Sequence, residues 1–210
     1  MTTASDDCTV KVWKLEEEDV LQRTYSDIDA TTSFSCFNSA VKSCLFHPVI
    51  PHLLTTTGAD NTIKFFDINS GVNDAVSTLS ISGLSQSVNN IGNISYNYTG
   101  SMMAIACKDK TLHVKDVRMG NTDSNVNIPP SNNVLGRNLR VAWCSSNRTD
   151  IGPLLTVSSS GTGMRQIQLF DPRKLTSSTT TGGSVLAPLC TKSIDNGAGQ
   201  LYPMFDEDTG

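Results

Sequence analysis

The chain contains the phrase DCTVKVWKL at residues 7–15, and three further versions of it follow along the 210 residues. They read DNTIKFFDI at 60–68, DKTLHVKDV at 109–117 and RQIQLFDP at 165–172. When Trp13, Phe66, Lys115 and Phe170 are aligned, successive copies are 53, 49 and 55 residues apart. Similarity that recurs at such a period indicates stacked units of supersecondary structure. The sequence therefore predicts a repeat protein.

Each copy alternates apolar and polar residues as a half-buried β-strand does. One side would carry Val10, Val12 and Leu15 in the first copy, and Ile63, Phe65 and Ile68 in the second. The first three copies open with Asp, whose short side chain can bond the backbone two residues on and so suits a turn. We expect the aligned aromatic residues to fill the space between sheets. Lys115, in the same position, would extend its ammonium group to solvent or leave its unit less well packed.

Further strands are expected in each unit. Two apolar stretches precede each of the later three phrases, at 41–48 and 52–57, at 91–97 and 101–106, and at 139–143 and 154–157. Turns are expected at 47–48, 99–100 and 151–153. Outer strands are expected at 21–24 and 76–79. Three or four strands a unit at this spacing predict the sheets of a β-propeller.

The composition favours a turn-dense β protein, with 17% charged and 6% aromatic residues and a net charge of −4. This charge argues against a general nucleic-acid binder. Its distribution is uneven. An acidic stretch holds Glu16, Glu17, Glu18, Asp19, Asp27 and Asp29 against Arg23, and a basic one holds Arg137, Arg140, Arg148, Arg165, Arg173 and Lys174 against Asp150 and Asp171. These stretches are either solvated surface or, in the basic case, a face for an acidic partner such as a filament or an anionic lipid.

Cofactor and metal sites are not expected. The six cysteines are not clustered, and with three histidines they offer no zinc spacing. Reduced, partly buried thiols are expected, as in a cytosolic protein. Three glycosylation sequons, at 93–95, 97–99 and 147–149, are expected by chance in a chain so rich in Asn, Ser and Thr. We expect no signal peptide, and no stretch of about 18 apolar residues occurs in these 210 residues.

An enzyme is not expected either. The motif G-x-S-x-G does not occur, and no Lys-Ser/Thr pair follows Gly161-Thr162-Gly163 as a phosphate loop requires. The histidines His47 and His113 suit structural positions in a turn and a strand. The acidic stretch 206–210 lacks the ligating Glu of a calcium loop. These residues supply no nucleophile, base and orienting group together.

The repeat phrases resemble degenerate WD repeats, and four blade-specific phrases resemble coronins. Residues 5–13 resemble the end of the second coronin blade, 100–110 the fourth, 164–173 the fifth, and 195–210 the start of the sixth. The resemblance implies an all-β, WD40-type propeller, of which this chain covers about four blades of an expected seven. The implied segments are 1–15 (end of blade two), 16–70 (blade three), 71–120 (blade four), 121–176 (blade five) and 177–210 (start of blade six).

Coronin resemblance implies an actin-filament-binding module that regulates the actin cytoskeleton in the cytoplasm. The alternative is a WD-repeat scaffold or adaptor at the Golgi and vesicle periphery, as in tandem-propeller coronins, or in ubiquitin ligation, without direct actin contact here. Filamentous actin and other proteins are the expected partners, with no nucleic acid, no integral membrane segment and no oligomerisation segment. The candidate partner-binding residues are Lys108, Lys110, Arg118, Arg165, Arg173 and Lys174, which we expect in turns between strands. Lacking the first blade, the arc would expose strand edges, so we expect marginal stability and a tendency to aggregate.

Overall fold

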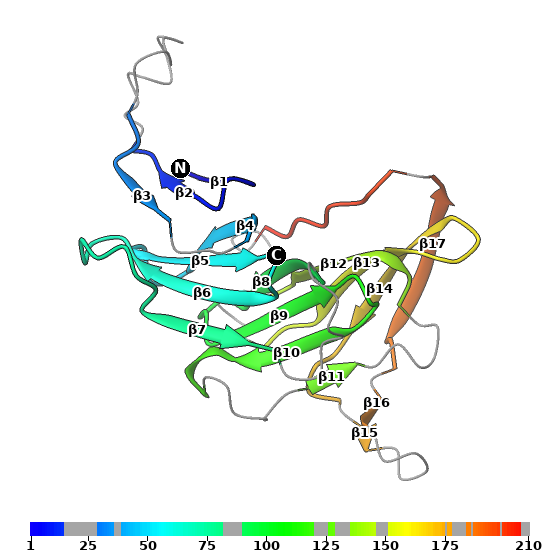
Figure 1. The fold of residues 1–210 in the computed structure, drawn as a ribbon. Helices are drawn as coiled ribbons and strands as arrows, with labels where there is room; N and C mark the ends of the chain where they lie inside the picture. Colours follow the sequence, from blue (N-terminus) through cyan, green and yellow to red (C-terminus); the bar gives the residue numbers. More distant parts are fainter. Residues whose placement is uncertain are drawn as a thin grey trace. The chain divides into compact units, whose positions relative to one another are not determined.

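The computed structural model describes residues 1–14, 29–35, 39–81, 90–119, 126–128, 135–145, 151–174, 176–177, 184–185, 187–197 and 199–206 (Figure 1). Two compact units, Met1–Ile81 and Ser82–Gly210, divide the chain, and each is described by itself. Within the described residues, the regular structure is antiparallel β apart from one short 3-10 helix, η1 (Val117–Met119). The predicted all-β class is confirmed.

The first unit holds a three-stranded and a four-stranded sheet. The three-stranded sheet consists of β1 (Thr2–Ala4), β2 (Val10–Val12) and β3 (Thr32–Phe34). The other is a meander of β4 (Val41–Phe46), β5 (Leu53–Gly58), β6 (Thr62–Asp67) and β7 (Ser77–Ser80). The outer strand expected at 76–79 is thus confirmed as β7, whereas 21–24 lies outside the described residues.

The second unit holds two four-stranded sheets and one two-stranded hairpin. One sheet consists of β8 (Ile91–Tyr96), β9 (Met102–Cys107), β10 (Leu112–Asp116) and β11 (Val126–Ile128). The other consists of β12 (Arg137–Trp143), β13 (Leu154–Ser159), β14 (Met164–Phe170) and β17 (Cys190–Asn196). The hairpin of β15 (Thr176–Ser177) and β16 (Ser184–Val185) comes between β14 and β17 in the chain (Figure 1).

The first three repeat phrases share one turn geometry, as the sequence predicts. In each, the Asp Oδ1 accepts hydrogen bonds from the backbone N–H and the hydroxyl of the Thr two residues on. The N···O distances are 2.9, 3.1 and 3.0 Å for Asp7–Thr9, Asp60–Thr62 and Asp109–Thr111. The residue between them has a positive φ of 69°, 62° or 67° (Cys8, Asn61, Lys110). A side-chain bond that closes the turn lets a non-glycine residue hold this left-handed conformation.

The aligned aromatic residues lie between sheets as expected, with one exception. Phe66 is fully buried with Phe34, Val10 and Leu54, and the two phenyl centroids are 5.0 Å apart. Phe170 is fully buried in a cluster that joins both four-stranded sheets of the second unit. Trp13 is instead half-buried, with its Nε1–H donating to Thr3 Oγ1 at 3.0 Å.

Lys115 contradicts the first of its two expected alternatives, an ammonium group extended to solvent, because the residue is only 1% exposed. The reason is that β10 is buried on both faces from Leu112 to Lys115, so that the side chain has no open route outward. A long side chain can extend to water only where one face of its strand is uncovered.

Side-chain hydrogen bonds join β8 and β12, each of which is an edge strand of its sheet. Asn93 accepts from the Val141 N–H and donates to the Val141 carbonyl, both at 2.9 Å. The Trp143 N–H donates to Ser95 Oγ at 2.9 Å, two residues further along both strands. Since the partner numbers rise together, β8 and β12 run in the same direction. This polar ladder fixes the two sheets of the second unit to each other.

Replacing Asn93 with alanine is expected to lower the free energy of unfolding of the second unit by about 1–3 kcal/mol, because the buried Val141 N–H and C=O would lose their partners. Urea unfolding followed by Trp143 fluorescence, in a Trp13→Phe background, measures this effect in the correct unit. Asn69→Ala, an exposed Asn in the first unit, is the matched control. Equal midpoints for both variants would contradict the role of the ladder.

Candidate functional site

The second unit has two ends, set by the shared direction of β8 and β12. The turns 108–110 and 160–163 lie at the end where these strands begin, which we call the leading end. Residues 97–101, 117–119 and 171–174 lie at the opposite, trailing end. The six basic residues predicted to bind partners therefore divide between the ends. The leading end carries Lys108, Lys110 and Arg165, and the trailing end carries Arg118, Arg173 and Lys174.

Two lysines of the leading end flank Asp109 in the β9–β10 turn. Asp109 accepts from Asn90 Nδ2 at 2.6 Å, and its own N–H donates to Asn90 Oδ1 at 3.0 Å. Lys108 is exposed, and Lys110 occupies the left-handed position of the turn. The aspartate is thus held by Asn90 and Thr111, which fixes the backbone that carries both lysines.

Arg165 was expected in a turn, but it is the second residue of β14. In this fourth copy, residues 160–163 form the turn between β13 and β14. The repeat phrase begins after that turn, at Arg165, inside β14. Arg165 forms a bidentate ion pair with Asp195 of β17, with Nε 2.5 Å from Oδ1, and also donates to the Gly199 carbonyl at 3.4 Å. These hydrogen bonds from the guanidinium hold the pKa of Asp195 below its usual value.

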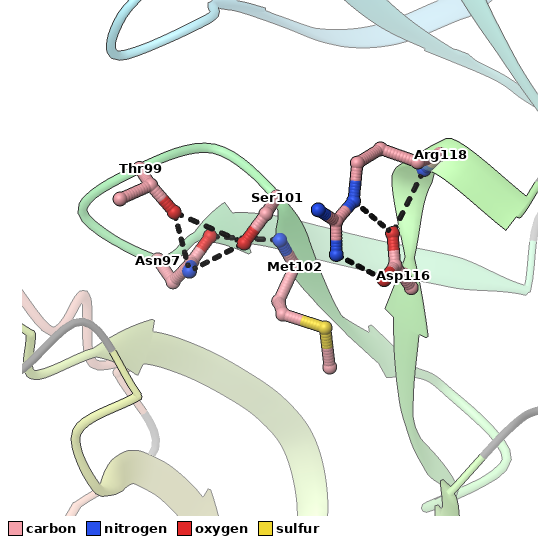
Figure 2. Close-up of polar contacts among 6 residues, drawn as sticks. All are labelled: Asn97, Thr99, Ser101, Met102, Asp116 and Arg118. Atoms are coloured by element: carbon pink, nitrogen blue, oxygen red, sulfur yellow. Dashed lines mark hydrogen bonds and ion pairs between the residues drawn. The ribbon is translucent and has the colours of Figure 1, made fainter.

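The trailing end repeats one Asp-x-Arg arrangement, which Figure 2 shows for Asp116 and Arg118. Oδ1 of Asp116 accepts from the backbone N–H and the Nε of Arg118, both at 3.0 Å, while Oδ2 lies 2.6 Å from the Arg118 terminal nitrogen. Asp171 and Arg173 form the same three contacts, at 3.1, 3.0 and 3.3 Å. In both pairs the arginine hydrogen bond lowers the pKa of the aspartate.

Exposed pairs of this kind contribute little stability, about 0–1 kcal/mol each. Their main effect is to fix the direction of Arg118 and Arg173 while part of each guanidinium stays in water; these two side chains are 74% and 62% exposed. Lys174 is also exposed, and its N–H donates to the Asp171 carbonyl at 3.0 Å. The Asp-x-Arg spacing is visible in the sequence, and it is the signal that could have predicted both pairs.

The loop beside Arg118 is closed by the side chain of Asn97 (Figure 2). Asn97 is fully buried, with Nδ2 donating to Thr99 and Ser101 at 3.1 Å and Oδ1 accepting from the Met102 N–H at 2.8 Å. The amide nitrogens of Asn93 and Asn97 therefore both donate hydrogen bonds inside the fold. The third sequon, at 147–149, lies outside the described residues, as do Arg148 and all of the acidic stretch except Asp29.

In the part of the chain that the structure describes, no three His, Cys, Asp or Glu side chains gather as metal ligands. No helix in that part is long and apolar enough to span a membrane. The five described cysteines are free thiols. Burial raises the pKa of the Cys107 thiol to about 12, so that thiol is a poor nucleophile at neutral pH.

The chain is similar to coronins over its whole length. It is 28% identical over 209 residues to the coronin-like protein crn1 of Schizosaccharomyces pombe and 24% identical over 212 residues to human coronin-2A. These matches cover all of this chain but 31% and 35% of the relatives, so the chain spans about one third of their length. No family model matches the chain.

A solved structure shares the fold. The WD40 domain of Toxoplasma gondii coronin matches with a TM-score of 0.72 and 20% identity, covering all of this chain and 47% of that one. The WD40-type fold, expected from the repeat phrases as part of a propeller, is thereby confirmed. Together with the relatives, this match shows that the chain is a coronin-like WD-repeat module.

Proposed function

We propose that this chain is an actin-filament-binding module of a cytoplasmic, cytoskeleton-associated protein, and that it acts by binding rather than catalysis. The observation that carries the proposal is the similarity to coronins across the whole chain, since coronin resemblance implies association with filamentous actin. The basic residues at the two ends of the second unit supply a chemical means, because a cationic surface attracts an acidic partner. Scaffolding of other proteins by the same fold is compatible with this role.

The leading end is the better candidate for the filament contact. There, Lys108 and Lys110 flank one carboxylate, and Asn90 and Thr111 already hold that carboxylate. At the trailing end, by contrast, Arg118 and Arg173 are each bonded to an aspartate of their own. A partner at the trailing end would have to compete with those aspartates, whereas at the leading end Lys108 is exposed on a turn whose backbone Asn90 and Thr111 hold in place.

Co-sedimentation with filamentous actin tests the proposal. We expect the chain to pellet with filaments at low salt, and pelleting to fall steeply as salt rises, because contacts between exposed charges are screened. The double variant Lys108→Gln/Lys110→Gln is expected to weaken binding by about tenfold, in line with roughly 0.7 kcal/mol for each exposed charge contact. Arg173→Gln/Lys174→Gln removes the same charge from the trailing end and is the matched control.

The outcomes separate three cases. Loss of binding in the lysine variant alone supports the leading end. Loss in the control variant alone keeps the actin proposal but moves the contact to the trailing end. If the unmodified chain does not pellet with filaments at low salt, the actin proposal for this segment is wrong.

A further inference from the structure

A polar pocket lies at the leading end of the sheet β12–β13–β14–β17. Its lining residues come from the start of β12, the β13–β14 turn and the end of β17: Arg137, Asn138, Ser159, Ser160, Gly163 and Gly197. Its volume is about 340 Å³, at the lower limit of small-molecule sites and large enough for one or two side chains. None of the six candidate partner-binding residues lines it. The pocket is thus a separate feature of the same end.

Two β-bulges shape this pocket. Arg137 pairs with Ser159 and Arg140 with Val157, so β12 has one residue more than β13 over this stretch, and Asn138 takes a positive φ of 56°. On the other side, Arg165 pairs with Asp195 and Gln166 with Ser193, which leaves Ile194 as an extra residue in β17. A bulge re-aims side chains at the end of a sheet. Here the two bulges interrupt regular pairing on both sides of the β13–β14 turn.

Charge at this turn differs from that at the other three. Where the first three turns hold Asp7, Asp60 and Asp109 just before the residue with positive φ, this turn holds Thr162 just before Gly163. The Thr162 hydroxyl shares one hydrogen bond of 2.8 Å with the Ser160 hydroxyl, and either can donate, so Ser160 can offer its own hydrogen to a ligand. The turn therefore replaces a fixed carboxylate with a donor.

Arg137 supplies the positive charge. It is exposed, and its contact in the described part of the chain is a long hydrogen bond of 3.5 Å to the Gly161 carbonyl, with no ion pair there. The neighbouring arginines are used otherwise: Arg165 pairs with Asp195, and Arg140 bonds the Gly92 carbonyl and lies 4.9 Å from the Tyr202 ring centroid. Among the described arginines of this end, Arg137 is thus the one whose donors are open to a ligand.

We propose that the Arg137 pocket binds the carboxylate of an Asp or Glu side chain in an acidic segment of a protein partner. The guanidinium of Arg137 would take the carboxylate in its fork, with Ser160 and Asn138 as further donors. Met164 and Ile194, which are 41% and 46% exposed, belong to the strands that end beside the pocket. A partner segment with an acidic residue between apolar ones would match both the Arg137 guanidinium and these two apolar side chains. The inference does not depend on filament binding, since none of the residues tested for that role lines the pocket.

A peptide suits the pocket better than an anionic membrane does. A membrane surface attracts a protein through several cations acting together. Here two of the three neighbouring arginines are already bonded within the fold, and the chain as a whole carries a net charge of −4. One open guanidinium beside hydroxyl donors is instead matched to a single carboxylate.

Fluorescence anisotropy on the 210-residue chain tests the pocket. The probe is a short fluorescein-labelled peptide of alternating Glu and Leu, and its comparison is the same peptide with Gln in place of Glu. We expect binding of the Glu peptide only, and a loss of at least about tenfold in affinity for Arg137→Gln. Arg137→Lys should also lose affinity, because lysine keeps the charge but not the fork.

Lys192→Gln is the matched control, since Lys192 is an exposed cation in the middle of β17. It should bind as the unmodified chain does, and Arg137→Gln should keep the same unfolding midpoint. Binding of the Gln peptide, equal losses in both Gln variants, or full affinity in Arg137→Lys would each overturn the proposal. So would binding to phosphatidylserine vesicles that depends on Arg137 and that excess Glu peptide does not displace.

Discussion

Replacing Phe170 with alanine is expected to lower the free energy of unfolding of the second unit by about 3–5 kcal/mol. Phe170 is fully buried and packs in a cluster with Ala104 and Leu112 of one sheet and Val141 and Leu154 of its own. The Phe170 ring therefore fills the space between the two four-stranded sheets of the second unit. Loss of the ring removes buried apolar area and leaves a cavity, and both effects act against folding.

Urea unfolding followed by Trp143 fluorescence measures the effect, because Trp143 is buried in the same cluster. The chain has two tryptophans, so Trp13→Phe removes the signal of the first unit. Met204→Ala is the control, since it also truncates a large apolar side chain of the second unit, but one that is 91% exposed. A shift for Phe170→Ala no larger than that for Met204→Ala would contradict the place of Phe170 in this core.

The second large effect is expected for Gly152→Ala, at about 3 kcal/mol. A Cβ at this buried position would lie 1.9 Å from the Cys144 carbonyl oxygen and 2.8 Å from its carbon. Both are backbone atoms that cannot rotate away, and the Cys144 N–H is bonded to the Pro153 carbonyl at 2.9 Å. The added methyl group must therefore push apart the end of β12 and the start of β13.

Gly161→Ala provides the comparison within the same sheet. A Cβ there meets no atom within 4 Å, and its φ is not in the left-handed region. The change should be neutral or stabilise by about 0.4–1 kcal/mol, through the reduced entropy of the unfolded chain. The midpoint of urea unfolding should thus fall for Gly152→Ala and stay unchanged or rise for Gly161→Ala. If Gly152→Ala left the midpoint unchanged, the close approach of the two backbone segments would be refuted.

Features set by short-range contacts were predictable from the sequence. The Asp turns were expected because each involves a side chain and a backbone group two residues apart. Alternation predicted the buried faces of β2 and β6, since side chains of a strand point to opposite sides in turn. The aligned position of Phe66 and Phe170 likewise indicated a place between sheets, and the structure agrees.

Features that depend on neighbouring strands were not predictable in this way. Extension of Lys115 to solvent was one of two expected alternatives, because its own phrase gives no sign that β10 is covered on both faces. The basic residues were treated as one set, whereas the shared direction of β8 and β12 divides them between two ends of the unit. The Arg173–Asp171 and Arg118–Asp116 pairs were not predicted, although the two residues of each pair are only two positions apart and the pairing could have been predicted from that spacing.

By itself, the sequence determined the repeated unit, its strand pattern, its Asp turns and its likeness to coronins. The repeated unit, strand pattern and Asp turns follow from contacts within a few residues, and the likeness to coronins follows from sequence motifs that occur in the same order as in that family. Tertiary structure alone decided which groups meet across the sheets. Asn93 bonds to Val141 although the two are 48 residues apart, and Arg137 meets the β13–β14 turn and Gly197 in one pocket. Such contacts arise only when separate strands are stacked and bulged together, and no local pattern encodes the pairing.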